Sequence, residues 1–133
     1  MDGMDATPSK IDLRYAEKTV VFTICDCSLD KKYSFYTLSK EEAGRFLSCL
    51  KHFEEMQWST LAGLDRKHGL TVEKETSESF QMIDLQNSSG QITEKYYYHL
   101  RVDQTGKFRI FGYQRERFFC ITHIDRGGII HHT

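Results

Sequence analysis

Three runs of alternating apolar and polar residues in the last third of the chain predict three consecutive antiparallel strands. They span residues 96–102, 107–113 and 118–124, and turn residues from Asp103 to Gly106 separate the first two. Alternation over about 4–8 residues is typical of a strand with one face against a core. The spacing of the runs therefore predicts a three-stranded meander.

Earlier in the chain the apolar period changes from that of a strand to that of a helix. Residues 18–25 and 33–37 are rich in β-branched and aromatic side chains, which predicts an N-terminal hairpin. Ser39 and Glu42 then have the spacing of a capping box, so a helix is expected to begin there. The apolar residues that follow form one stripe at helical spacing, namely Ala43, Phe46, Leu47, Leu50, Phe53 and Met56.

The middle of the chain has weaker patterns. A short second helix is predicted over residues 58–64, followed by a polar loop over residues 65–69. Residues 77–85 have helical spacing, and residues 87–90 break the chain. Taken together, the elements predict an α+β fold. An antiparallel sheet, made of the N-terminal hairpin and the C-terminal meander, is covered on one face by a helical layer.

Length and composition limit the number of domains. The 133-residue chain is 39% hydrophobic, which suffices for one core but not for two ordinary domains. We expect a flexible N-terminal segment, residues 1–17, followed by a single α+β domain, residues 18–133. We find no signal-peptide pattern and no apolar run near the ~20 residues that cross a bilayer. The expected location is therefore cytoplasmic, with no membrane partner.

Four cysteines, Cys25, Cys27, Cys49 and Cys120, are scattered along the chain. In a domain that can bury a core without disulfides, reduced and mostly buried thiols are expected. Cys120 lies three residues before His123, but zinc ligands usually come in paired loop knuckles, which this spacing does not supply. We therefore predict no metal site and no small-molecule cofactor.

The net charge of −1 conceals an imbalance along the chain. Residues 1–90 carry 11 Lys and Arg against 15 Asp and Glu, a balance of −4, whereas residues 91–133 carry 7 against 4, a balance of +3. The basic excess lies on the predicted meander, where it can attract a polyanion locally. Ordinary surface solvation accounts for the same charges.

Strand alternation places Tyr97, His99 and Arg101 on one face of the meander and leaves Tyr98 and Leu100 for the core. The basic groups then share a half-exposed surface with aromatic rings. This is the composition of single-stranded RNA sites, where bases stack and arginines neutralise phosphates. The residues expected to bind RNA or a protein partner are Tyr97, Arg101, Lys107, Tyr113 and Arg117.

In the third strand of the meander, the same alternation groups His123 with Phe119 and Ile121. Cys120 and Thr122 are expected on the opposite face.

Three motifs of the meander carry a resemblance to a known family: Y-x-H-L-R from Tyr97, G-K-F-R-I from Gly106 and F-C-I-T-H-I-D-R from Phe119. They are similar to the C-terminal sheet of RelE/ParE-type bacterial toxins. The chain also looks like small uncharacterised bacterial and phage proteins that share a Trp, a His, an L-R and an R-I-F-G motif. The resemblance is strongest over residues 96–126.

RelE-type toxins are ribosome-dependent mRNA endonucleases, whereas the ParE branch acts on gyrase, so the resemblance leaves the activity open. If the RNA-cleaving activity carries over, Arg109 and Arg126 fall where the family has arginines that bind phosphate and stabilise the transition state. His99 or His123 would serve as general acid or base while a ribose 2′-hydroxyl attacks its own 3′-phosphate. The family has basic residues at the positions of Tyr97 and His99. The resemblance further implies RNA or the ribosome as a target, and an antitoxin partner.

A second hypothesis is a noncatalytic protein-binding module on the same fold, such as a phage-encoded inhibitor or an adaptor. Tyr and Arg, which are frequent in this segment, are enriched in binding hot spots. The acidic total favours this hypothesis, because ribosome-dependent toxins are typically strongly basic. Whether the protein is an enzyme therefore stays open at this point.

Overall fold

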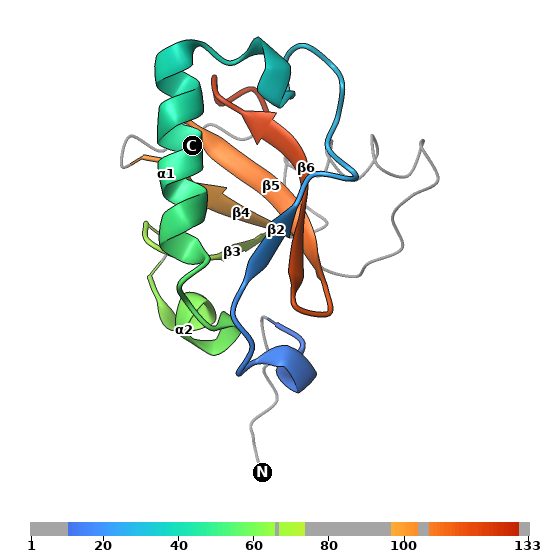
Figure 1. Cartoon of the computed structure of the whole chain (residues 1–133), viewed down its shortest axis with the longest axis vertical. Coiled ribbons are helices and arrows are strands. Elements are labelled where there is room, and N and C mark those ends of the chain that lie inside the picture. The colour runs from blue at the N-terminus through green and yellow to red at the C-terminus, as the bar shows by residue number, and fades with distance from the viewer. Residues whose placement is uncertain (1–10, 66, 74–96, 104–106, 131–133) are drawn as a thin grey trace.

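The computed structural model describes residues 11–65, 67–73, 97–103 and 107–130 (Figure 1). The described elements are a mixed sheet, two α-helices and two short 3-10 helices, which together make an α+β fold. In chain order they are η1 (Leu13–Tyr15), β2 (Val21–Thr23), η2 (Phe35–Thr37), α1 (Lys40–Phe53), α2 (Trp58–Gly63), β3 (Thr71–Glu73), β4 (Tyr97–Arg101), β5 (Arg109–Arg115) and β6 (Phe118–Asp125).

The five strands follow the order β2-β6-β5-β4-β3. The meander β4-β5-β6 is antiparallel, as predicted, and β3 adds to its far edge opposite β4. β2 pairs with β6 in parallel, with Val21 opposite Phe118. The sheet is therefore mixed, and the prediction of a purely antiparallel sheet was wrong. The strand β3 was not predicted, and the helical pattern of residues 77–85 lies outside the described residues.

The predicted N-terminal hairpin is absent from the described chain, because residues 35–37 form η2 and β2 pairs with β6 instead. Local hydrogen bonds explain the difference. The Thr37 hydroxyl donates to the carbonyl oxygens of Lys31 and Ser34, and the Tyr33 amide donates to the Asp30 carbonyl. Such short-range bonds close turns and compete with a strand ladder.

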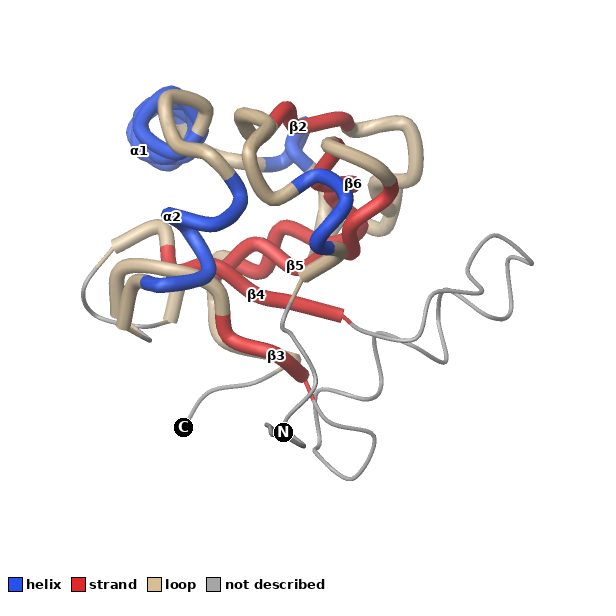
Figure 2. Tube along the Cα trace, turned by 90° about the horizontal axis from the view of Figure 1, so that it is seen from below, coloured by secondary structure: helices blue, strands red, loops and turns tan. Residues whose placement is uncertain are grey.

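Both helices lie on one side of the sheet (Figure 2). α1 begins where predicted, with a complete capping box. Ser39 Oγ accepts from the Glu42 amide at 3.1 Å, and Glu42 Oε1 accepts from the Ser39 amide at 2.8 Å. α2 confirms the short second helix. In the described part of the chain, no helix is long and apolar enough to cross a membrane.

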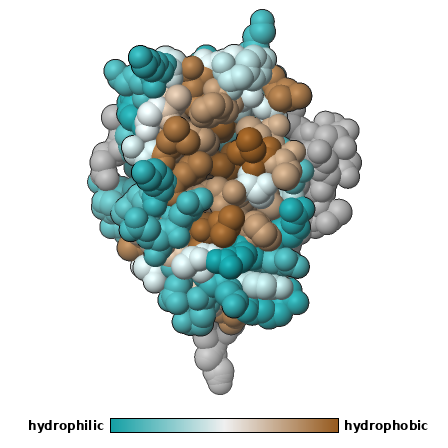
Figure 3. Space-filling model, viewed as in Figure 1, coloured by the Kyte–Doolittle hydropathy of each residue, from teal (hydrophilic) through white to brown (hydrophobic). Residues whose placement is uncertain are grey.

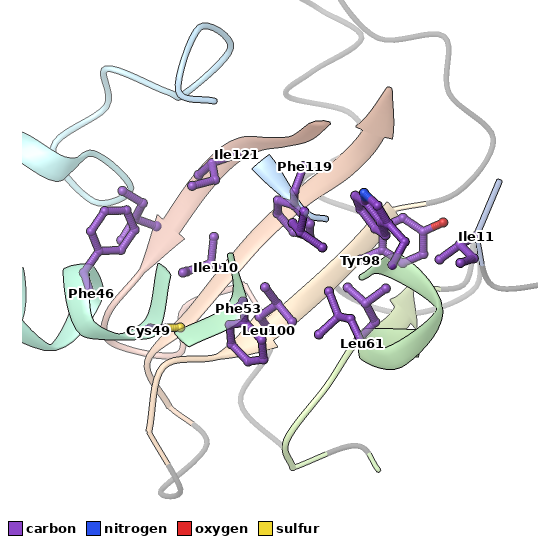
Figure 4. Close-up of a cluster of buried hydrophobic side chains, with 14 of the residues drawn as sticks. Ile11, Phe46, Cys49, Phe53, Leu61, Tyr98, Leu100, Ile110, Phe119 and Ile121 are labelled. Atoms are coloured by element: carbon purple, nitrogen blue, oxygen red, sulfur yellow. The ribbon is translucent and has the colours of Figure 1, made fainter. Parts of the chain in front are cut away.

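The main core lies between the helices and the sheet (Figure 4). α1 contributes Phe46, Cys49 and Phe53, and the sheet supplies Leu100, Ile110, Phe119 and Ile121 among others. Trp58, the first residue of α2, is fully buried and stacks on Phe119 with ring centroids 6.3 Å apart. Its indole Nε1–H donates to the Arg117 carbonyl at 2.7 Å, which ties α2 to the β5-β6 turn.

A β-bulge in β6 changes which face of the sheet His123 occupies. Phe111 pairs with His123 but the next residue, Gly112, pairs with Ile121, so Thr122 is the extra residue. The bulge reverses the alternation. His123 therefore lies on the face opposite Ile121, and the grouping predicted by simple alternation was wrong.

The packed part of the chain begins before residue 18. Ile11 is only 8% exposed and belongs to the main core, and the Asp12 amide donates to Gln114 Oε1 at 2.9 Å. Residues 11–17, which we expected to be flexible, thus pack against the domain. The remainder of the predicted flexible segment lies outside the described residues.

Candidate functional site

The predicted RNA-binding face of the meander is buried. Tyr97, His99, Arg109, Tyr113 and His123 are each at most 3% exposed. The alternation of β4 was predicted correctly, and these side chains do lie on one face. The expectation that this face is half-exposed is corrected, because a second apolar cluster forms there. Its buried members are Tyr33, Tyr97, Phe111, Tyr113, Cys120 and Ile130.

His123 sits in a neutral, enclosed environment. The Thr122 hydroxyl donates to the Phe111 carbonyl at 3.1 Å, so the Nδ1–H of His123 donates to Thr122 Oγ1 at 3.0 Å. The edge of the Tyr33 ring lies against the imidazole, with centroids 5.1 Å apart. Burial lowers the pKa of His123 to about 4. The imidazole is therefore uncharged near neutral pH and enclosed by protein.

Tyr113 joins two parts of the chain that are far apart in sequence. Its hydroxyl donates to Asp26 Oδ2, in the loop that follows β2. Burial, reinforced by the bonded Asp26, raises the pKa of Tyr113. The phenol is thus held protonated, as a fixed donor rather than an exposed binding group.

Two other predicted site residues, Arg126 and Arg117, form hydrogen bonds at chain junctions. Arg126 donates to the Thr37 carbonyl and, at 3.3 Å, to Glu42 Oε1, so it anchors the start of α1. Arg117 donates to Thr19 through Nε, at 3.2 Å, and through Nη2. These two arginines stabilise chain junctions in the structure.

Lys107 is exposed, and Arg101 lines a cavity beside α1. The fold therefore does not bring all of the predicted catalytic and binding residues into one accessible site. Catalytic roles for His99, His123, Arg109 and Arg126 stay predictions.

A different surface, which the sequence analysis did not single out, is open and apolar. Figure 3 shows apolar residues gathered on the face between α1 and β2. Ile24 is 62% exposed, Leu47 50% and Phe35 41%. We name this region the α1–β2 surface; its apolar members are Phe22, Ile24, Phe35, Leu47 and Leu50.

The apolar stripe of α1 is the sequence pattern that could have predicted this surface. The sheet covers only part of this stripe, since Phe46 and Phe53 are buried whereas Leu47 is half-exposed. The ring of Phe35 lies 5.5 Å from that of Phe46 and extends the patch beyond the helix. The exposed side of the stripe is thus continuous with the core.

Beside this surface, β2 presents an edge of the sheet. Its Val21 amide donates to the Arg117 carbonyl, whereas the preceding Val20 amide donates to the Met56 carbonyl on the opposite side. Because successive residues of a strand alternate, the Phe22 amide and carbonyl point away from β6. No described strand pairs with β2 on that side. Within the described residues, the backbone amide and carbonyl of Phe22 thus have no strand partner.

Comparisons with known proteins do not assign the site: no family model, curated protein or solved structure matches the chain. Among the residues that the structure describes, no group of three or more His, Cys, Asp or Glu side chains is placed to hold a metal ion. The α1–β2 surface and the buried face are thus the features of the structure that bear on function.

Proposed function

We propose that this protein is a noncatalytic protein-binding module. Its partner adds an extended segment to the edge of β2 and covers the α1–β2 surface with apolar side chains. The observation that carries the proposal is the position of an unpaired strand edge directly beside exposed apolar side chains. Strand addition of this kind uses main-chain hydrogen bonds for affinity and side-chain contacts for specificity.

The composition of β2 supports the proposal. Natural proteins protect sheet edges with very short strands, charged residues, proline or bulges, because an open edge can pair with any extended chain. β2 is short, but its residues Val21, Phe22 and Thr23 include no charge and no proline. Contiguous exposed apolar patches on soluble proteins commonly mark interaction sites. An uncharged edge that pairs with no other described strand, beside such a patch, favours a partner that covers both.

Steric considerations favour a segment of a different protein over a second copy of this chain. The stretch before β2 is already paired on its outer side, through the bridge between Thr19 and Gln57. A symmetric antiparallel pairing centred on Phe22 would bring Ile24 of one copy opposite Val20 of the other. The chain beyond Ile24 would then collide with the paired stretch around Gln57. A single narrow segment avoids this collision.

The RNA-cleaving activity that the RelE-like resemblance implies is a weaker proposal. Cleavage of RNA would require His99, His123 and Arg109 at a surface that RNA can reach, and these side chains are buried. One implication of the resemblance agrees with the proposed binding function, because an antitoxin would be a protein partner of this kind. The cytoplasmic location expected from the sequence also stays a proposal.

Site-specific photo-crosslinking in the source cell tests the proposal. A photoreactive residue at position 24 or at position 47 is expected to yield an adduct with the same protein. Leu13, which is 68% exposed on η1, provides a matched apolar control position. Leu47→Asp is expected to abolish the adduct formed from position 24, because a carboxylate placed against an apolar segment stays unpaired. Leu13→Asp is expected to leave that adduct unchanged.

Two results would overturn the proposal. One is the same set of adducts from all three positions, which would indicate nonspecific contact. The other is an adduct with the mass of a dimer of this chain, which would assign the surface to self-association. Unfolding midpoints of both Asp variants should lie close to that of the wild type, since Leu13 is largely exposed and Leu47 is half-exposed.

A further inference from the structure

A cavity of about 690 Å³ lies on the flank of α1 that does not carry Leu47. This volume falls in the range of small-molecule sites, about 300–1,000 Å³. The cavity is bounded by α1, by the segment that ends β4 and by the turn before β3. Its lining residues are Glu41, Gly44, Arg45, Ser48, Cys49, His52, Phe53, Lys67, His68, Arg101, Val102 and Asp103.

A glycine in the second turn of α1, Gly44, lines the cavity. A Cβ built on Gly44 would meet nothing within 4 Å, so close packing does not explain its presence there. Glycine inside a helix is less favourable than alanine by about 0.5–1 kcal/mol. The space over Gly44 is therefore the feature that a ligand would use.

The two carboxylates of the cavity are already paired. Arg45 Nη2 lies 3.4 Å from Glu41 Oε1, and Arg45 Nη1 lies 3.3 Å from Asp103 Oδ2. The guanidinium also lies over the ring of Phe108, 6.0 Å from its centroid. The two carboxylates and the guanidinium groups of Arg45 and Arg101, which all line the cavity, have formal charges that sum to zero.

The opposite end holds the basic groups His52, Lys67 and His68. Asp65 organises two of them: its Oδ1 accepts from the backbone amides of Lys67 and His68, each at 3.1 Å. The same oxygen lies 2.7 Å from His68 Nδ1, which leaves Nε2 of that ring available to a ligand. Within the described chain, no carboxylate lies within ion-pair distance of Lys67 Nζ. Among the residues that the structure describes, the ammonium group of Lys67 thus has no carboxylate partner.

We propose that this cavity binds a phosphate monoester of about nucleotide size. Lys67 and the two histidines hold the phosphate by charge-assisted hydrogen bonds, which are stronger than those between neutral groups. The buried Phe53 and the adjacent Val102 provide an apolar floor for the body of the ligand. The ligand approaches over Gly44, where a side chain would block it.

Isothermal titration of the purified chain with three probes tests this assignment: adenosine monophosphate, adenosine and inorganic phosphate. The monophosphate is expected to bind more tightly than adenosine by at least about tenfold, because one charge-assisted hydrogen bond typically raises the affinity by about this factor. Lys67→Ala is expected to weaken monophosphate binding by a similar factor. Lys51→Ala, a change to an exposed lysine of α1 that does not line the cavity, is expected to leave it unchanged.

A second variant separates loss of the site from loss of the fold. Gly44→Leu places a side chain in the cavity and is expected to abolish monophosphate binding, while helix propensity keeps the unfolding midpoint at or above that of the wild type. Gly63→Ala, at the end of α2 and also with open space around a built Cβ, is the matched control. Binding that survives Gly44→Leu would overturn the assignment, as would equal affinity for adenosine and the monophosphate. Saturable binding of inorganic phosphate as tight as that of the monophosphate would assign the site to free phosphate and would also contradict the proposal.

Discussion

Trp58→Ala is expected to lower the free energy of unfolding by about 3–5 kcal/mol, the typical loss when a buried large aromatic side chain is truncated. Trp58 is fully buried in the main core, stacks on Phe119 and bonds the Arg117 carbonyl through its indole N–H. The substitution leaves a cavity and removes one of the two hydrogen bonds that the Arg117 carbonyl accepts, at the junction of α2 with the β5-β6 turn. Chemical denaturation followed by circular dichroism measures the change.

Trp58→Phe separates the two contributions. It retains an aromatic ring against Phe119 but removes the N–H that donates to Arg117. The loss of stability in Trp58→Phe should therefore be clearly smaller than that in Trp58→Ala, about 1 kcal/mol for the lost hydrogen bond together with the cost of a partly filled site, because the Val21 amide still donates to the Arg117 carbonyl. A Trp58→Ala variant as stable as the wild type would show that α2 does not pack as described.

The second large effect is a loss of stability in mild acid, caused by His123. Burial lowers the pKa of this histidine to about 4 in the folded protein, against an ordinary value of about 6.5. Between these values the unfolded chain binds the proton more readily, so stability falls as pH falls. The contribution is complete above pH ~6.5 and is lost by pH ~4. Since each pKa unit corresponds to about 1.4 kcal/mol, it amounts to about 3 kcal/mol.

His123→Phe isolates this contribution from general acid denaturation. Phenylalanine has no titrating group and suits the aromatic surroundings of Tyr33 and Phe111. The difference in unfolding free energy between variant and wild type should shift in favour of the variant by about 3 kcal/mol between pH 7 and pH 4. His52→Phe, at an exposed position of α1, is the matched histidine-to-phenylalanine control. Parallel profiles for the wild type and His123→Phe would contradict the burial of this side chain.

Local signals in the sequence predicted local structure well. The capping box of Ser39 and Glu42 fixed the start of α1, because both of its hydrogen bonds form within one helical turn. Alternation in β4 correctly separated Tyr97 and His99 from Tyr98 and Leu100. The meander followed from short connections between adjacent runs, which favour antiparallel neighbours.

Features that depend on distant contacts were missed. The parallel pairing of β2 with β6 joins segments nearly a hundred residues apart, and no short-range pattern specifies it. The extra residue at Thr122 moved His123 to the other face, and only the opposite strand reveals such a bulge. Gly112 is a local sign of the bulge in the sequence, since a Cβ there would overlap the Cys120 carbonyl.

The candidate site was misplaced for the same reason. Alternation showed which side chains share a face, but it does not show what covers that face. Tyr33 and Ile130, which are nearly a hundred residues apart in sequence, join the apolar cluster that buries Tyr97 and Tyr113. The open α1–β2 surface depends in turn on how much of the α1 stripe the sheet covers, which is a property of the assembled fold.

Amide hydrogen exchange at Phe22 tests the central claim most directly, in the free protein and in complex with the partner that crosslinks at position 24. In the free protein the Phe22 amide should exchange faster than that of Thr23, which faces β6. Binding should slow the exchange at Phe22 by at least about tenfold, because strand addition gives this amide a hydrogen-bond acceptor. A Phe22 amide that is already protected in the free protein, or one whose exchange is unchanged in the complex, would contradict strand addition at β2.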